Sequence, residues 1–212
     1  MSSPHVAVID YGMGNVRSVM SALKYLGAVV DLIGNPNSLS TYEFLVLPGV
    51  GSFRRGMQQL QDRKLDIAIY DTVSKNKTKI LGICLGMQLL GVHGTEDGET
   101  DGLGLVNQGV DRFTPEEVGG GKIPHVGFNS VHFSEQSGLF RGLKQNADFY
   151  FTHSYRMEAH GMEGKRATCQ YGTNFLAAFE ENNVCGAQFH PEKSQTNGLT
   201  LLHNFLEKKN GC

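Results

Sequence analysis

The sequence lacks several features that would place it in other protein classes. No apolar run in its 212 residues approaches the length of a membrane span, and Met1–Pro4 leads into a strand-like segment without the apolar core of a signal peptide. Basic residues number 19 against 21 acidic ones, and no basic stripe is present. We therefore expect neither a membrane nor a nucleic acid among its partners.

Cysteine is scarce as well. The four cysteines (84, 169, 185 and 212) have neither paired nor metal-like spacing, so we expect free thiols in a reducing cytoplasm. Glycine is abundant instead, at 27 residues, which indicates many tight turns and close backbone approaches.

The first half of the chain alternates apolar strands with helices. This alternation is typical of βαβ units, and it predicts an α/β fold of three layers: a mostly parallel central sheet with helices on both faces. The second helix is expected to bury Leu60, Ile67 and Val73. Strands are expected at 5–10, 29–33, 44–47 and 79–84, and helices at 17–26 and 56–74.

The pattern changes after residue 92. Residues 94–104 are rich in glycine and acidic side chains and are interpreted as a loop, and 106–133 suggests a small antiparallel excursion. Further strands are expected at 148–155, 176–180 and 184–189, followed by an amphipathic helix at 198–208. With no repeat, low-complexity segment or linker, residues 1–212 are predicted to form one domain.

Cys84 lies at a break between an apolar strand and the first turn of a helix. Gly82 and Gly86 flank it at the two positions where side chains would collide in a tight strand-to-helix turn. This is the pattern of a nucleophile elbow, with sulfur in place of the serine oxygen. A thiol at a helix N-terminus is favoured as the reactive thiolate, so Cys84 is the candidate nucleophile.

His190 directly follows the last apolar strand, so it should lie at the same sheet edge as Cys84. Pro191 interrupts the strand path, and Glu192 is placed to turn back toward the imidazole. A thiol needs a base, and that base needs a carboxylate to orient it and stabilise its cation. Cys84, His190 and Glu192 are therefore predicted to form a catalytic triad.

Residues 48–51 (Pro-Gly-Val-Gly) end a neighbouring strand and offer free backbone N–H groups. Together with the amide of Leu85 they are expected to form an oxyanion hole. Glycines on both sides of Val50 allow its peptide to rotate at little cost, so the hole is predicted to be switchable.

These segments resemble the class I (triad) glutamine amidotransferases. Residues 82–88 and 189–192 carry the motifs specific to that superfamily. Over essentially the whole chain, further segments are similar to the glutaminase subunits of imidazole glycerol phosphate synthases: 10–15, 48–53, 122–125, 153–155 and 190–194.

The resemblance implies hydrolysis of L-glutamine to glutamate and ammonia through a thioester on Cys84. It places Gly51 and Leu85 in the oxyanion hole, and it implies no metal and no nucleotide cofactor. The ammonia would pass to a synthase (cyclase) partner with a (βα)8-barrel fold, in a heterodimer serving histidine biosynthesis. Positions that match substrate-binding residues of the family are Gln88, Glu96, Ser154 and Tyr155. Positions that match its partner-facing residues are Met13, Asn15, Pro124, Val126, Phe128 and Lys193.

Two departures from the family pattern leave alternatives open. Val126 and Phe128 stand where the family usually has Met and Trp, and Gly91–Gly94 replaces the usual continuation of the elbow helix. The first leaves open the same chemistry serving a sugar amidotransferase of surface-polysaccharide biosynthesis. A cysteine peptidase or DJ-1-like protein shares the elbow, although the His-Pro-Glu segment argues against it. A non-catalytic scaffold is disfavoured because all three triad residues are present.

Overall fold

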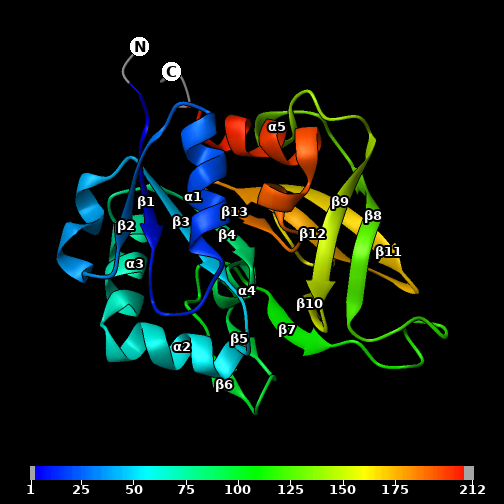
Figure 1. Cartoon of the computed structure of the whole chain (residues 1–212). Helices are drawn as coiled ribbons and strands as arrows, with labels where there is room; N and C mark the ends of the chain where they lie inside the picture. Colours follow the sequence, from blue (N-terminus) through cyan, green and yellow to red (C-terminus); the bar gives the residue numbers. More distant parts are fainter. Residues whose placement is uncertain (1–2, 208–212) are drawn as a thin grey trace.

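A mixed β-sheet of nine strands forms the centre of the computed structural model, which describes residues 3–207 (Figure 1). The first five strands across the sheet are parallel, and the others are antiparallel. In spatial order they are β2 (Val29–Ile33), β1 (His5–Ile9), β3 (Phe44–Gly49), β4 (Lys79–Cys84), β13 (Val184–Ala187), β12 (Thr173–Glu181), β11 (Lys165–Tyr171), β8 (His125–Phe133) and β9 (Asn146–His153).

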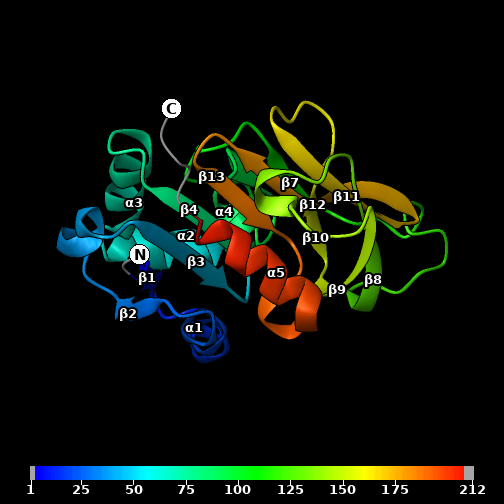
Figure 2. The same ribbon diagram turned by 90° about the horizontal axis from the view of Figure 1, so that it is seen from above.

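Helices cover both faces of the parallel part, which confirms the expected α/β class. Along β1, Val6 and Val8 pack against one helical layer, and Ala7 and Ile9 against the other. This alternation follows from the two-residue period of a strand, and both faces are apolar because both are covered. Figure 2 shows α1 (Val16–Tyr25) and α5 (Gln195–Phe205) on one side, and α2 (Phe53–Asp62), α3 (Leu65–Ser74) and α4 (Leu85–Leu89) on the other.

The single helix predicted for 56–74 is wrong, because α2 and α3 are separate helices. Lys64 adopts a left-handed conformation (φ 57°) between them, which ends the first helix and reorients the second. The second helix then buries Leu65, Ile69 and Val73, a four-residue repeat. Ile67 therefore faces outward and is 63% exposed, contrary to the prediction that it points inward.

A second, smaller sheet occupies part of the stretch predicted as loop. It has the order β10 (Tyr155–Met157), β7 (Gly109–Arg112), β5 (His93–Gly94), β6 (Thr100–Asp101) within the described residues. Asp97 and Gly98, both with positive φ, form the turn between β5 and β6. An Asp-Gly pair is a hairpin signal, so the sequence contained the information that this stretch is paired at its ends.

The antiparallel strands are more extensive than the expected excursion. β11 was not predicted, because its outward positions are polar and only Ala167 and Cys169 are buried. The strand predicted at 148–155 divides at Ser154 into β9 and β10. The last strand ends at Ala187, short of the predicted 189, and α5 begins three residues before the predicted start, with Lys208 outside the described residues.

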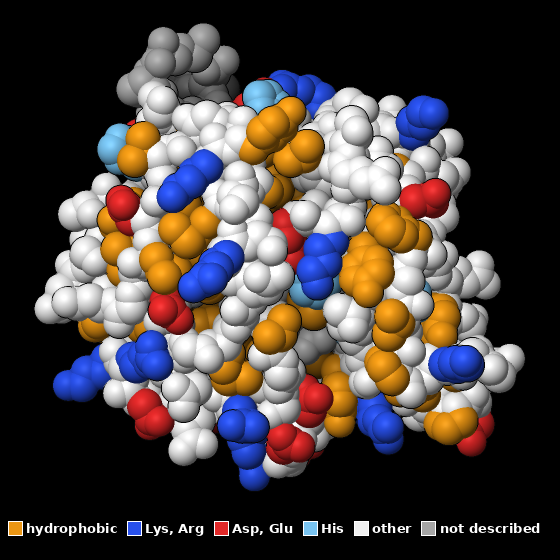
Figure 3. All heavy atoms as spheres, viewed as in Figure 1, with side chains coloured by type: hydrophobic (Ala, Val, Ile, Leu, Met, Phe, Trp, Pro, Cys, Tyr) orange, Lys and Arg blue, Asp and Glu red, His pale blue; other side chains and the backbone are white. Residues whose placement is uncertain are grey.

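The surface of the face that carries α1 and α5 is mixed in character. Apolar side chains reach it in separate groups, with Lys, Arg, Asp and Glu between them (Figure 3). Among residues 3–207, no helix is both long and apolar enough to cross a membrane.

Candidate active site

The elbow at Cys84 has the geometry that its sequence predicts. Cys84 joins β4 to α4 with φ 54° and ψ −113°, a backbone conformation that residues other than glycine rarely adopt. A Cβ added at Gly86 would lie 1.7 Å from the Leu47 carbonyl oxygen, and one at Gly82 would lie 2.6 Å from the Gly86 carbonyl oxygen. Both positions therefore exclude any larger residue, and the sulfur is held at the carboxyl end of β4.

The sulfur of Cys84 lies between two other elements of the sheet. The side chain is 6% exposed, and Sγ lies 3.8 Å from the Thr152 carbonyl oxygen at the end of β9. Gln188 Nε2 approaches Sγ to 3.8 Å from the segment after β13. Gln188 is fully buried and was not singled out from the sequence. The available signal was its position as the one polar side chain in an apolar run, two residues before His190.

His190 and Glu192 form a buried pair behind Cys84. A short 3₁₀ turn, Pro191–Lys193, brings Glu192 back so that its Oε1 lies 2.8 Å from His190 Nδ1. The two side chains are 3% and 1% exposed. The main chain of His190 is also fixed, since its N–H donates to the Tyr150 carbonyl and its carbonyl accepts from Ser194 Oγ.

The surroundings of His190 favour its protonated form. Burial alone would lower its pKa, but the nearby Cys84 and Glu192 outweigh burial and raise the pKa to about 9. Nδ1 is occupied by Glu192, and Nε2 has no hydrogen-bond partner among the described residues. This leaves Nε2 as the nitrogen that exchanges a proton with the sulfur or with a substrate.

A cavity of about 460 Å³ opens over Cys84 and is large enough for an amino acid. It brings together residues that are far apart in the chain but were selected from the sequence for the active site, together with Pro124, which was expected to face the partner. The predicted residues that line it are Val50, Gly51, Cys84, Leu85, Gln88, Glu96, Pro124, Ser154 and Tyr155. Thr152 and His153 line it too and had not been assigned a role.

The turn expected to supply oxyanion donors lies directly beside the elbow. Gly51 has φ 113°, a region that other residues rarely adopt, and Val50 is 43% exposed. Close by, the hydroxyl of Tyr11 is buried without a partner among the described residues. Burial, and then the charge of Cys84, raise the Tyr11 pKa, so this hydroxyl remains protonated.

Gln88 and Glu96 close the far side of the cavity. Gln88 is 4% exposed and donates to the Tyr155 carbonyl at 2.9 Å and to Gln188 Oε1 at 3.0 Å. Glu96 Oε2 accepts the backbone N–H of Phe53 at 3.0 Å, at the start of α2. Burial raises the Glu96 pKa, with that N–H opposing the shift and Asp97 adding to it.

Of the six residues expected to face a partner, Pro124 lines this cavity. Val126 and Phe128 are 57% and 54% exposed on β8. Lys193 Nζ lies 5.6 Å from the centre of the Tyr150 ring, which also contacts the Phe128 ring at 5.6 Å. Asn15 and Pro124 are exposed, and Met13 is half-buried beside Gly51.

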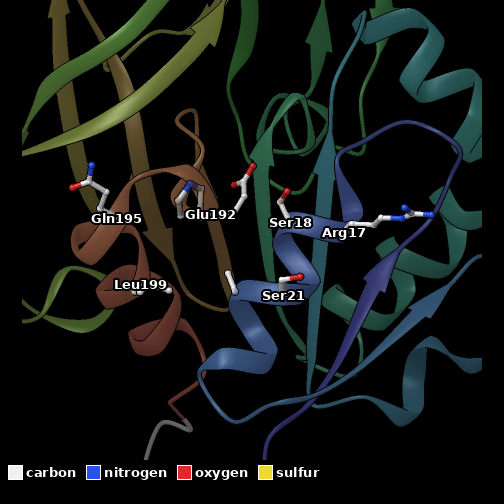
Figure 4. A pocket seen from close by; sticks show the side chains of 8 residues that line it. Arg17, Ser18, Ser21, Glu192, Gln195 and Leu199 are labelled. Carbon is white, nitrogen blue, oxygen red and sulfur yellow. The ribbon is translucent and has the colours of Figure 1, made fainter.

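A second cavity, of about 440 Å³, reaches Glu192 from between α1 and α5 (Figure 4). Ser18 and Ser21 line it from α1, and Gln195 and Leu199 from α5. In Figure 4 the Arg17 side chain points away from Glu192, whose Oε2 is buried without a partner among the described residues. No cluster of three or more His, Cys, Asp or Glu side chains in residues 3–207 has the geometry to hold a metal ion.

Comparison with known proteins identifies relatives along nearly the whole chain. Residues 7–209 match the family model described as "Glutamine amidotransferase class-I". The chain is 42% identical over 202 residues to "Imidazole glycerol phosphate synthase subunit HisH" of Moorella thermoacetica, covering 95% of this chain and 94% of that one. It is 41% identical over 201 residues to "subunit HisH 1" of Campylobacter jejuni, covering 95% and 98%.

Solved structures share the fold at lower identity. A structure titled "Crystal structure of glutamine amidotransferase" has a TM-score of 0.73 at 20% identity, covering 95% of this chain and 96% of that chain. A chain of the structure titled "Structure of PurLQS from Thermotoga maritima" has a TM-score of 0.73 at 18% identity, covering 97% and 98%. These likenesses support the fold alone.

Proposed function

The chain belongs to the class I glutamine amidotransferases, and from this premise we propose that it is the glutaminase subunit of an imidazole glycerol phosphate synthase. It hydrolyses L-glutamine and passes the ammonia to a synthase partner, a (βα)8 barrel, in histidine biosynthesis. The whole chain acts as one glutaminase domain in this proposal. The thiols of Cys84 and Cys169 are free, which fits a reducing cytoplasm.

One observation carries the proposal. The cavity places Cys84, with the His190–Glu192 pair behind it, opposite polar residues suited to the amino-acid end of glutamine. Glu96 offers a carboxylate for the α-ammonium group, and Ser154 and Tyr155 line the same cavity. A side-chain amide entering between these groups would meet the sulfur.

The first half of the reaction uses the triad as a nucleophile and its base. The sulfur, whose proton is already held by His190 Nε2, attacks the carboxamide carbon, and Glu192 stabilises the imidazolium. The oxyanion receives hydrogen bonds from the amides of Leu85 and of the Val50–Gly51 turn, each worth about 3–4 kcal/mol in the transition state. The C–N bond then breaks, His190 gives its proton to the leaving nitrogen, and ammonia departs from a thioester on Cys84.

The second half regenerates the enzyme. Neutral His190 takes a proton from water, which attacks the thioester carbon through a second oxyanion. Collapse of that intermediate breaks the C–S bond and releases glutamate, and His190 keeps its proton beside the sulfur, which restores the starting pair. Ammonia released without an acceptor is wasted, so we propose that partner binding turns the glycine-flanked Val50 peptide to complete the oxyanion hole.

The test compares substrates and partners in one assay. Purified chain, alone and with a candidate barrel partner in the presence of its ligand, is given L-glutamine, L-asparagine or casein. We expect glutamate and ammonia from glutamine only, slowly from the isolated chain and faster by orders of magnitude from the complex. Casein cleavage without glutamine turnover would overturn the proposal, and full activity of the isolated chain would remove the switch.

A second candidate is the same chemistry in the service of a sugar amidotransferase. The observation that favours it is the pair Val126 and Phe128, exposed where the family usually carries Met and Trp. Co-purification from the native cell distinguishes the two. Recovery of a barrel partner supports the histidine pathway, and recovery of a sugar-modifying synthetase supports the alternative.

A further inference from the structure

Two buried histidines lie beside the triad, and no step above uses them. His125 on β8 and His153 on β9 are 3% and 6% exposed and stand directly opposite each other across the antiparallel strand pair. Side chains at such positions project from the same face of the sheet. His125 Nδ1 accordingly lies 3.1 Å from His153 Nε2.

The Tyr155 carbonyl sets the direction of this contact. It lies 2.8 Å from His153 Nδ1, and because a carbonyl oxygen only accepts, Nδ1 must carry the hydrogen. In a neutral ring, Nε2 of His153 is then unprotonated and accepts a hydrogen bond from His125 Nδ1–H. His125 Nε2 is therefore also unprotonated, and it accepts a hydrogen bond from Asn129 Nδ2 at 3.4 Å.

The amide of Asn129 is itself oriented by its neighbours. Its Oδ1 accepts the Ser130 N–H at 2.8 Å, and its Nδ2 also donates to the Gln170 carbonyl at 3.2 Å. Rotating the amide by half a turn would lose both hydrogen bonds. The donors therefore run in one direction, from Asn129 through His125 and His153 to the Tyr155 carbonyl.

Protonation of either histidine would break this order, because two N–H groups would face each other. Burial lowers the pKa of His125 to about 4. Burial also lowers the pKa of His153, to about 3, with the Tyr155 carbonyl opposing the shift and the charges of His125 and His190 adding to it. Both rings are therefore neutral at physiological pH.

The run of hydrogen bonds ends on the wall of the glutamine cavity. The Tyr155 carbonyl accepts a second hydrogen bond from Gln88 Nε2 at 2.9 Å, so both of its lone pairs are used. Ser154 and Tyr155 line the cavity. Their backbone is thus held from one side by Gln88 on α4 and from the other by His153.

We propose that His125 and His153 are positioning residues for the substrate: a neutral, one-directional pair that holds the Ser154–Tyr155 edge where the amino-acid end of glutamine binds. The inference rests on the proposed function, and it adds residues that act on binding through the backbone. His125 is adjacent to exposed Val126, so the pair also connects the expected partner strand to the cavity wall.

Two substitutions of His125 separate hydrogen bonding from packing. His125→Phe keeps a ring stacked on Tyr171 (4.0 Å between centroids) and Phe151 (4.8 Å) but removes the donor to His153. His125→Asn loses the ring but keeps an N–H near the position of Nδ1. His132→Phe is the matched control, because His132 is on the same strand, exposed, and hydrogen-bonded to Asn146 away from the cavity.

The expected result is a split between KM and kcat. In the complex, His125→Phe should raise KM for glutamine about tenfold and change kcat by less than about twofold, because one buried acceptor loses its donor. His125→Asn should stay within about twofold of wild type in both constants, and His132→Phe should match wild type. A wild-type KM for His125→Phe, or a larger defect in His125→Asn than in His125→Phe, would overturn the inference.

A spectroscopic measurement tests the pair independently of activity. Long-range proton–nitrogen correlation spectra of the ¹⁵N-labelled chain at neutral pH should show His125 and His153 as neutral rings protonated on Nδ1. An Nε2–H form or an imidazolium at either position would contradict the inference, even if His125→Phe failed to fold. Absence of glutamine turnover in the wild-type complex would instead refute the proposed function and leave the tautomer assignment intact.

Discussion

The parallel and antiparallel parts of the sheet present their side chains to the cavity in different ways. In the parallel part the reactive groups stand at or just beyond strand ends: Cys84 is the last residue of β4, and His190 lies just beyond β13. In the antiparallel part they are fixed by strand pairing: His125, the first residue of β8, stands opposite His153, the last residue of β9. The turn after a parallel strand places one residue through local backbone geometry, whereas the antiparallel pair places two residues through the register between the strands.

This difference suggests a division of labour. The ends of the parallel strands would hold the groups that make and break bonds, and the elbow glycines leave Cys84 almost no freedom. The paired strands hold the substrate edge, and they carry the exposed side chains Val126 and Phe128. Changes in the parallel part should therefore affect the chemical step, and changes in the antiparallel part should affect binding and coupling to the partner.

Removing the base should have the largest effect. His190→Ala should lower glutamine turnover by about 10⁵-fold or more, and Glu192→Gln should be about 100-fold less damaging, because an amide still orients the ring. Steady-state kinetics of the complex measures both. An inactive Glu192→Gln beside a mildly affected His190→Ala would reverse the assigned roles.

The oxyanion turn should come next. Gly51→Ala should lower kcat by about 10²–10³-fold, because a side chain is strained at φ 113° and its Cβ would lie 2.6 Å from Met13 Cε. Gly27→Ala is the control, since Gly27 also has positive φ (87°), with no atom within 4 Å of the added Cβ, and lies outside the cavity. Equal kcat values for the two variants would show that the turn supplies no donor.

The pH profile should respond to the carboxylate behind His190. Ammonia leaves with a proton from the imidazolium, so kcat/KM should fall as pH rises through about 9, the pKa of His190. Glu192→Gln should move this limb to lower pH, because the hydrogen bond and charge of Glu192 help to raise that pKa. If kcat/KM fell at the same pH in Glu192→Gln and in wild type, Glu192 would not be what raises the pKa of His190.

The same pKa has a consequence for stability. It is raised above the unfolded value of about 6.5, so the contribution of His190 to folding is fully present below pH 6.5 and is lost as pH rises through about 9. The difference in unfolding free energy between wild type and His190→Gln should follow that window in denaturant titrations.

The smallest effect is expected at the partner face. Phe128→Trp restores the usual family residue at an exposed aromatic position, so it should strengthen binding to a histidine-pathway barrel from a species with that Trp by a few-fold. Wild type should bind its own synthase better than that barrel. Tyr25→Trp, at the far end of α1 and 78% exposed, is the control. Equal affinity and equal stimulation of glutamine turnover for wild type and Phe128→Trp with both synthases would show that residue 128 does not affect partner choice.

The difference between local turns and strand pairing also explains what the sequence could predict. The elbow and the return of Glu192 toward His190 are local, so motifs of a few residues were sufficient. The contact between His125 and His153 joins residues 28 positions apart, and it exists only because of the register between β8 and β9. Ile67 was misplaced for a related reason, since one left-handed residue, Lys64, reoriented a whole helix.

The most direct test of Cys84 as the nucleophile is covalent labelling with a glutamine-like electrophile. The complex is treated with 6-diazo-5-oxonorleucine and mapped by mass spectrometry, beside a Cys84→Ser variant that should fold and bind its partner but turn over almost no glutamine. We predict one label per chain on Cys84, protection by glutamine, and no label on Cys169, Cys185 or Cys212. Label found mainly at another cysteine, or equal labelling of Cys84→Ser, would contradict Cys84 as the nucleophile.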